Sequence, residues 1–182
     1  MERILIVGAG GSGKTTFARA LSGKTGLPVV HLDAIYWTGR WELLTREEFS
    51  ARIEEELQKP RWIMDGNYQR TFARRAEFCD CILYLDFSPI VCVFSVLKRK
   101  VAYHGRTRPD MGGNCPERLD VSFLKWVLTY RRKIGPETLR LIQESGKEYR
   151  IFKNRKQLKQ FLNSLPSAFR SQKDKADIAL SR

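Results

Sequence analysis

The segment GAGGSGKTT, residues 8–16, combines residue types and spacing that suit the binding of a phosphate chain. It matches the pattern G-x-x-x-x-G-K-[ST] at every fixed position, and a short apolar run precedes it. Glycines let the backbone fold tightly so that its N–H groups point at phosphate oxygens, and a following helix adds positive field. Lys14 is expected to reach the β- and γ-phosphates, and Thr15 to place its hydroxyl on Mg²⁺. The sequence therefore predicts a site for ATP and Mg²⁺, with the binding residues Gly8, Gly10, Gly11, Ser12, Gly13, Lys14, Thr15 and Thr16.

Such a site also needs an acidic residue at the end of a neighbouring strand to hold the metal ion. Asp65 in RWIMDG and Asp86 in YLDFSP both follow apolar runs, and the strand order that decides between them is not given by the sequence. Gly66 lets the chain turn close to a ligand directly after Asp65. We therefore predict that Thr15 and Asp65 form the metal site, with an ordinary turn at Asp65 as the alternative.

A second substrate is expected beside the phosphate site, in the segments HLDAIYWTGRW (31–41) and DGNY (65–68). A phosphate acceptor is already ionised and requires no general base, whereas a hydroxyl acceptor requires one, and Asp33 at a strand end is suited to that role. The alternatives are a turn role for Asp33 and simple packing for Trp37. His31 is expected to be a core residue or to support a neighbouring site residue. The predicted acceptor-binding residues are Asp33, Trp37, Asp65, Gly66, Asn67 and Tyr68.

The segment VAYHGRTRPDMGGNCPERLD, residues 101–120, contains three arginines, three glycines, two prolines and no apolar periodicity. Irregular loops longer than ~12 to 15 residues are uncommon in compact domains and are usually lids, binding loops or disordered segments. The net charge of +13 lies entirely in the second half of the chain: residues 1–95 carry twelve Lys/Arg and twelve Asp/Glu, and residues 96–182 carry twenty-one and eight. This asymmetry indicates a polyanion-binding surface or a site that gathers phosphate charge.

Size and composition predict one folded domain over residues 1–165 and a polar, disordered tail over 166–182. The longest nearly apolar run, FSPIVCVFSVL, has eleven residues, whereas about 20 are needed to span a bilayer. We therefore expect no membrane segment and no signal peptide, and a cytoplasmic location. The four cysteines form no C-x-x-C pair and are expected to be reduced, buried side chains rather than metal ligands.

The elements that must position these residues follow from short apolar runs at 3–7, 28–32, 61–65, 81–86 and 148–152, separated by helical patterns. Such runs are typical of a parallel sheet buried on both faces, the α/β class. Helix starts are indicated by Thr45 with Glu48, by Ser88 with Pro89, by Asp120, and by Asn154 with Gln157.

Taken in order, the segments GAGGSGKTT, HLDAIYW, WIMDGNYQRT, YLDFSP, GRTRPDMGGNCPERLD and FLKW resemble the P-loop kinases of the nucleoside monophosphate kinase type. Within these, the chain is most similar to the bacterial DNA topology modulation proteins, over about residues 1–165. The resemblance implies a five-stranded parallel sheet of order 2-3-1-4-5, which supports Asp65 as the metal-side residue. It also implies a lid over about 101–119 and an acceptor-side segment over about 33–58.

The resemblance further implies that arginines of the lid and its flanking helices surround the transferring phosphoryl group, and that Asn154 and Arg155 pack against adenine. Replacement of Arg108 by Ala is then expected to lower turnover more than ATP affinity. The sequence departs from adenylate kinases at DGNYQRT, which is one residue longer than their DGFPRT, so Arg70 is not assigned the acceptor phosphate. The predicted catalytic residues are Lys14, Asp33, Arg99, Arg106, Arg108 and Arg132, with Arg131 as a further candidate.

The function predicted from these residues is transfer of the γ-phosphoryl group of ATP to a small acceptor, a nucleotide or a nucleoside-like molecule. A nucleic-acid-binding regulator of DNA topology that depends on ATP is the alternative, since the chain is strongly basic, with a pI of about 9.9. No helix-turn-helix, zinc finger or RNP motif is present to favour it. A slow ATPase switch is a third possibility.

Overall fold

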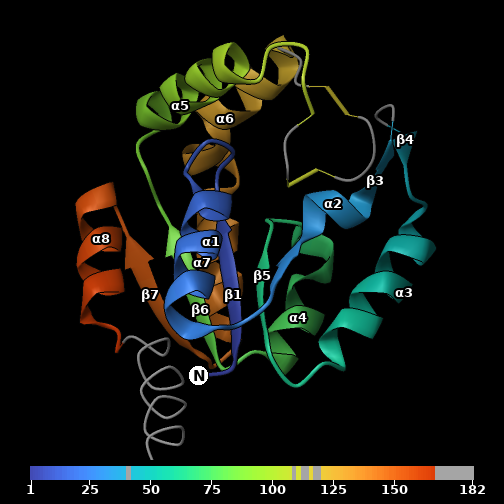
Figure 1. Cartoon of the computed structure of the whole chain (residues 1–182), viewed down its shortest axis with the longest axis vertical. Coiled ribbons are helices and arrows are strands. Elements are labelled where there is room, and N and C mark those ends of the chain that lie inside the picture. Colours follow the sequence, from blue (N-terminus) through green and yellow to red (C-terminus); the bar gives the residue numbers. More distant parts are fainter. Residues whose placement is uncertain (40–41, 108–109, 112–114, 117–119, 167–182) are drawn as a thin grey trace, which may run out of the picture.

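The computed structural model describes residues 1–166 except 40–41, 108–109, 112–114 and 117–119 (Figure 1). Its central sheet has five strands in the order β2-β5-β1-β6-β7, all pairing in parallel. The strands are β1 (Arg3–Gly8), β2 (Val29–His31), β5 (Trp62–Asp65), β6 (Cys81–Leu85) and β7 (Glu148–Phe152). The predicted α/β fold and the predicted strand order 2-3-1-4-5 are both confirmed.

The connections between these strands are mostly helical. The helices are α1 (Lys14–Thr25), α2 (Leu32–Tyr36), α3 (Arg46–Leu57), α4 (Phe72–Phe78), α5 (Pro89–Ala102), α6 (Val121–Lys133), α7 (Gly135–Glu144) and α8 (Arg155–Ser164), with a 3₁₀ turn η1 at Gln69–Thr71. A short antiparallel hairpin, β3 (Trp37–Gly39) with β4 (Glu42–Leu43), follows α2. Trp37 therefore lies in a strand, although the four-residue spacing between Trp37 and Trp41 would also fit a helix. Trp41 lies outside the described residues.

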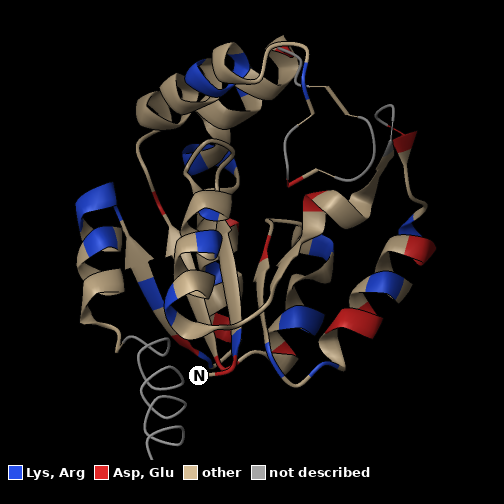
Figure 2. Cartoon of the chain, in the orientation of Figure 1, with Lys and Arg blue, Asp and Glu red and all other residues tan. Residues whose placement is uncertain are grey.

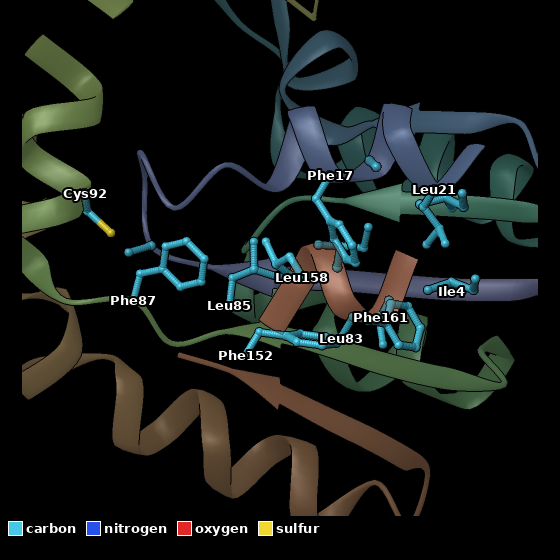
Figure 3. Packing of buried hydrophobic residues seen from close by; sticks show 14 of the residues in the cluster. Ile4, Phe17, Leu21, Leu83, Leu85, Phe87, Cys92, Phe152, Leu158 and Phe161 are labelled. Atoms are coloured by element: carbon cyan, nitrogen blue, oxygen red, sulfur yellow. The ribbon is translucent and has the colours of Figure 1, made fainter. Parts of the chain in front are cut away.

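Alternation of side chains along the buried strands builds two cores, one on each face of the sheet. On β1, Ile4 and Ile6 face α1 and α8, whereas Leu5 and Val7 face α3, α4 and α7. Figure 3 shows the first core, where Phe17 of α1 meets Phe152 and Phe161 with ring centroids 5.8 and 6.2 Å apart. The central strands β1, β5 and β6 are thus buried on both faces, which explains why they are continuous apolar runs. The edge strand β2 is half-buried, and the edge strand β7 is exposed from Glu148 to Ile151.

All four predicted helix starts are confirmed, and three of them have a side-chain capping hydrogen bond, whereas Ser88 at α5 has none. Thr45 and Glu48 form a reciprocal capping box at α3, Asp120 accepts the backbone N–H of Ser122 at α6, and Asn154 accepts that of Gln157 at α8. Pro89 occupies the first turn of α5. Each cap joins residues two or three apart, so the sequence contains all the information that is needed.

All four cysteines are buried, as predicted. Within the described part of the chain, no helix is both long enough and apolar enough to cross a membrane.

Candidate active site

A cleft of about 1100 Å³ opens beside the carboxyl ends of β1, β2 and β5, where parallel α/β sheets commonly bind ligands. Its walls come from the glycine-rich loop, α1, α2, the residues after β5, and the helices α5, α6 and α8. Asp110 and Met111, from the segment between α5 and α6, also line it and are buried. The cleft thus collects residues from most of the predicted site segments.

The glycine-rich loop fits tightly between β6 and α5. Gly8 and Gly11 adopt positive φ angles of 146° and 78°. A Cβ atom at Gly8 would lie 2.6 Å from the carbonyl oxygen of Leu85, and one at Gly11 would lie 2.2 Å from that of Cys92. Only glycine satisfies both the conformation and the space. The loop therefore brings its backbone amides close together, as phosphate binding requires.

Lys14 begins α1 and curls back over this loop. Its Nζ donates hydrogen bonds to the carbonyl oxygens of Gly8 and Ala9, both at 2.9 Å. Burial lowers the pKa of Lys14, while the nearby carboxylates of Asp33 and Asp65 act in the opposite direction. The ammonium group consequently lies within electrostatic reach of both predicted acidic residues.

Thr15 and Asp65 lie side by side, as a shared metal site would require. Thr15 Oγ1 donates to Asp65 Oδ2 at 2.9 Å, and His31 Nδ1 lies 2.7 Å from Asp65 Oδ1. The register of β2 and β5 pairs His31 directly with Asp65. A hydroxyl and a carboxylate suit Mg²⁺, which commonly takes one or two protein ligands and completes its shell with water and phosphate oxygens. Clusters of three or more His, Cys, Asp or Glu able to hold a metal are absent from the described residues.

Asp86, the rival candidate, is occupied elsewhere. Arg131 of α6 contacts its two carboxylate oxygens at 3.0 and 3.1 Å. Strand order does not separate the two candidates, because β5 and β6 both neighbour β1. The contact of Asp65 with Thr15 distinguishes them instead. The same ion pair turns Arg131 toward Asp86.

The acceptor-side residues form a connected group. Tyr68 donates its hydroxyl to Asp33 Oδ1 at 2.8 Å, and burial together with the Asp33 carboxylate raises the pKa of Tyr68, so the phenol stays protonated. Trp37, Gly66 and Asn67 line the cleft with them. The predicted acceptor-binding set is therefore brought together, although its members come from α2, β3, the end of β5 and the turn that follows it.

Two further residues hold this turn in place, and sequence reasoning did not single them out. Arg75 is fully buried and donates to the carbonyl oxygens of Gly66 at 3.2 Å and Tyr68 at 2.9 Å. Tyr130 of α6 donates to Asn67 Oδ1 at 2.8 Å. These partners lie 7 to 63 residues away in sequence. No local sequence pattern predicts these contacts. Arg75 also cannot be told from its exposed neighbour Arg74 by residue type.

Some of the residues predicted to bind ATP or to act in catalysis line the cleft, and others do not. Arg99 and Arg155 line the cleft, and Arg155 Nη2 donates to Ser95 Oγ at 2.9 Å. Arg106 and Arg132 are exposed and do not line it, and Asn154 serves as the cap of α8 outside it. Arg108 lies outside the described residues. The catalytic roles of these side chains remain predictions.

Comparison with known proteins supports the fold. A family model described as isopentenyl transferase matches residues 1–63, which include the glycine-rich loop. The search of curated protein sequences returned no match. A solved shikimate kinase from Acinetobacter baumannii, in complex with shikimate, is similar over 90% of this chain and 89% of its own, with a TM-score of 0.54 and 19% identity.

A gluconokinase from Sinorhizobium meliloti 1021 is similar over 79% of this chain and 94% of its own, with a TM-score of 0.43 and 15% identity. At 19% identity, the likeness to the shikimate kinase concerns the fold alone, an α/β fold with a five-stranded parallel sheet flanked by helices. The narrower resemblance to DNA topology modulation proteins stays a prediction.

Proposed function

We propose that the protein is an ATP-dependent kinase that transfers the γ-phosphoryl group to a small molecule bound in the same cleft. The observation that carries this proposal is the meeting of Lys14, Thr15 and Asp65 beside a glycine-rich loop, with Asp33 and Tyr68 across from them. The cleft of about 1100 Å³ is slightly larger than ordinary ligand pockets, which span ~300 to 1,000 Å³, and it suits two substrates.

Each residue has a role that phosphoryl transfer requires. The amides of the loop and Lys14 hold the β- and γ-phosphates, and Thr15 with Asp65 holds the metal. When bound, Mg²⁺ neutralises charge on the phosphate oxygens. Arg99 and Arg155, which line the cleft, supply further positive charge near the phosphate chain. The protein's contribution is alignment and electrostatic stabilisation rather than covalent chemistry.

The test is ADP release from MgATP in the presence of a panel of nucleotides, nucleosides and small hydroxyl compounds, compared between the unmodified chain and Lys14→Ala. We expect Lys14→Ala to lower turnover by about 10² to 10³-fold, as the loss of one charge-stabilising donor commonly does. The matched control is Lys24→Ala, which removes a lysine from the last turn of the same helix, outside the cleft. Undiminished turnover in Lys14→Ala would refute the kinase proposal.

A further inference from the structure

The acceptor side of the cleft is acidic, whereas most of the cations that line the cleft lie on other elements. These cations come from α1, α5 and α8: Lys14, Arg19, Lys98, Arg99, Arg155 and Lys159. The acceptor-side segments, residues 31–37 and 65–69, contribute two carboxylates to the cleft, Asp33 and Asp65, and no Lys or Arg among their described residues. Two further carboxylates, Asp110 and Asp120, line the cleft from the segment between α5 and α6, where Asp110 lies 4.0 Å from Arg19. ATP is a polyanion, so the cations match the donor. The acidic acceptor side is suited to a molecule that is not an anion.

The arginines nearest to the acceptor side do not offset its negative charge. Arg75 is fully buried behind the turn, where it donates to Gly66, Tyr68 and Thr71, and burial lowers its pKa to about 10. Arg70 is exposed and does not line the cleft. Neither Arg70 nor Arg75 therefore lines the cleft, where a guanidinium could bind an acceptor phosphate.

Asp33 is held in a geometry that suits a base. Its Oδ1 accepts the Tyr68 hydroxyl at 2.8 Å, which fixes the carboxylate. Among the described residues, Oδ2 has no hydrogen-bond partner, while Asp33 lines the cleft. Asp65 is engaged differently, because its Oδ2 accepts from Thr15 and its Oδ1 contacts His31. Asp33 is thus the carboxylate that remains able to accept a proton from a bound substrate.

From this arrangement, and resting on the proposed kinase function, we infer that the acceptor is an alcohol without a phosphate or carboxylate group of its own, and that Asp33 takes its proton. The alcohol oxygen bonds to the γ-phosphorus of ATP as the bond from that phosphorus to the β,γ-bridging oxygen breaks. The hydroxyl proton passes to Asp33 and then to solvent. The products are a phosphate ester and ADP. An anionic acceptor would instead be repelled by Asp33.

The first experiment offers the full-length chain MgATP with two sets of compounds. One set holds uncharged or cationic alcohols: the common nucleosides, hexoses, polyols, ethanolamine and choline. The other holds nucleoside monophosphates and hydroxy acids. ADP release is followed together with mass spectrometry of the phosphorylated product, and Lys14→Ala is the blank. We expect a phosphate ester from a member of the first set and none from the second.

The second experiment compares Asp33→Asn with Glu47→Gln on the alcohol that is turned over. Asp33→Asn keeps the size of the side chain and an oxygen for Tyr68 but removes the base, so kcat should fall by about 10² to 10⁴-fold. MgATP affinity, measured by calorimetry, should be retained. Glu47→Gln removes one negative charge from the exposed first turn of α3, outside the cleft, and should leave kcat unchanged.

The outcomes separate the inference from the function on which it rests. Phosphorylation of a nucleoside monophosphate or a hydroxy acid in preference to every alcohol would overturn the inference and leave the kinase intact. An unchanged kcat in Asp33→Asn would do the same. If no compound of either set raises ADP release above the Lys14→Ala blank, the proposed function itself fails.

Discussion

Arg75 shows how a residue outside the cleft can determine the shape of a site within it. Its guanidinium donates to Thr71 Oγ1 at 3.1 Å and to the carbonyl oxygens of Gly66 and Tyr68. These residues belong to the turn that follows β5 and carries Asn67 and Tyr68 into the cleft. A buried guanidinium with five N–H donors in a planar fork can satisfy several carbonyls at once, which a lysine ammonium matches poorly.

Replacement of Arg75 by Met should lower the free energy of unfolding by about 2 to 4 kcal/mol, because buried carbonyl oxygens lose their donors. Urea denaturation monitored by fluorescence measures this change. The adjacent Arg74 is half exposed and pairs with Glu54 and Glu77 on the surface, so Arg74→Met should cost less than about 1 kcal/mol. Equal losses in the two variants would show that Arg75 does not hold the turn.

Predictability at this scale depends on how far apart in sequence the interacting residues are. Lys14 and Thr15 belong to one contiguous motif, and the structure places them where that motif predicts. The contact of Asp65 with Thr15 spans 50 residues and was predicted only because strand-end geometry brings them to one edge. Arg75 and Tyr130 form side-chain contacts that neither motif nor periodicity encodes, so the sequence did not reveal them.

At the scale of elements, the glycine-rich loop is confined between β6 and the first turn of α5. Gly11 and Gly13 both have positive φ, at 78° and 91°, yet their surroundings differ. A Cβ at Gly11 would lie 2.2 Å from the Cys92 carbonyl oxygen, whereas nothing lies within 4 Å of a Cβ at Gly13. Substitutions at these two positions can therefore distinguish the cost of backbone strain, which is common to both, from the cost of steric crowding, which arises only at Gly11.

Gly13→Ala should cost about 1 to 2 kcal/mol of stability, which is the strain of a left-handed residue alone. Gly11→Ala adds a clash with the backbone of α5, which raises the loss by a further 1 to 3 kcal/mol, roughly the cost of overpacking. Thermal unfolding of both variants tests this order. A Gly11→Ala protein as stable as Gly13→Ala would mean that α5 moves away from the loop without cost.

The elements that were predicted and those that were missed differ in how local their determinants are. Helices α3, α6 and α8 have capping residues within three positions of their start, and the sequence identifies each one. The hairpin of β3 and β4 contains strands of three and two residues, too short for an alternating pattern to be recognised. Trp37 consequently enters the cleft from a strand.

Across the whole molecule, the charge step along the sequence is only partly carried into the cleft, because Lys14 and Arg19 of the first half and Asp110 and Asp120 of the second half also line it. Lys98, Arg99, Arg155 and Lys159 come from the basic second half and line the cleft on α5 and α8. The neutral first half supplies Asp33 and Asp65. Figure 2 shows the Lys and Arg residues of α5, α6 and α8, which carry few acidic neighbours. The sequence revealed the excess of cations, but only folding shows which of them border the cleft.

Because α1, α5 and α8 border one cleft, binding of MgATP should stabilise the domain as a whole. At a ligand concentration of 100 Kd the gain is about 2.7 kcal/mol, which for a domain of this size raises the Tm by roughly 5 to 10 °C. Differential scanning fluorimetry measures the shift. EDTA should reduce it, since Thr15 and Asp65 then hold no metal, and Lys14→Ala should abolish it.

The same thermal-shift measurement compares binding of MgATP with binding of nucleic acid. A double-stranded DNA oligonucleotide, added without ATP, offers phosphates to all exposed cations and none that fits the glycine-rich loop. If the cleft cations serve ATP, DNA should raise the Tm by much less than MgATP, and any DNA effect should disappear with added salt and be equal in Lys14→Ala. A larger shift with DNA than with MgATP would favour a nucleic-acid partner for the basic half of the chain.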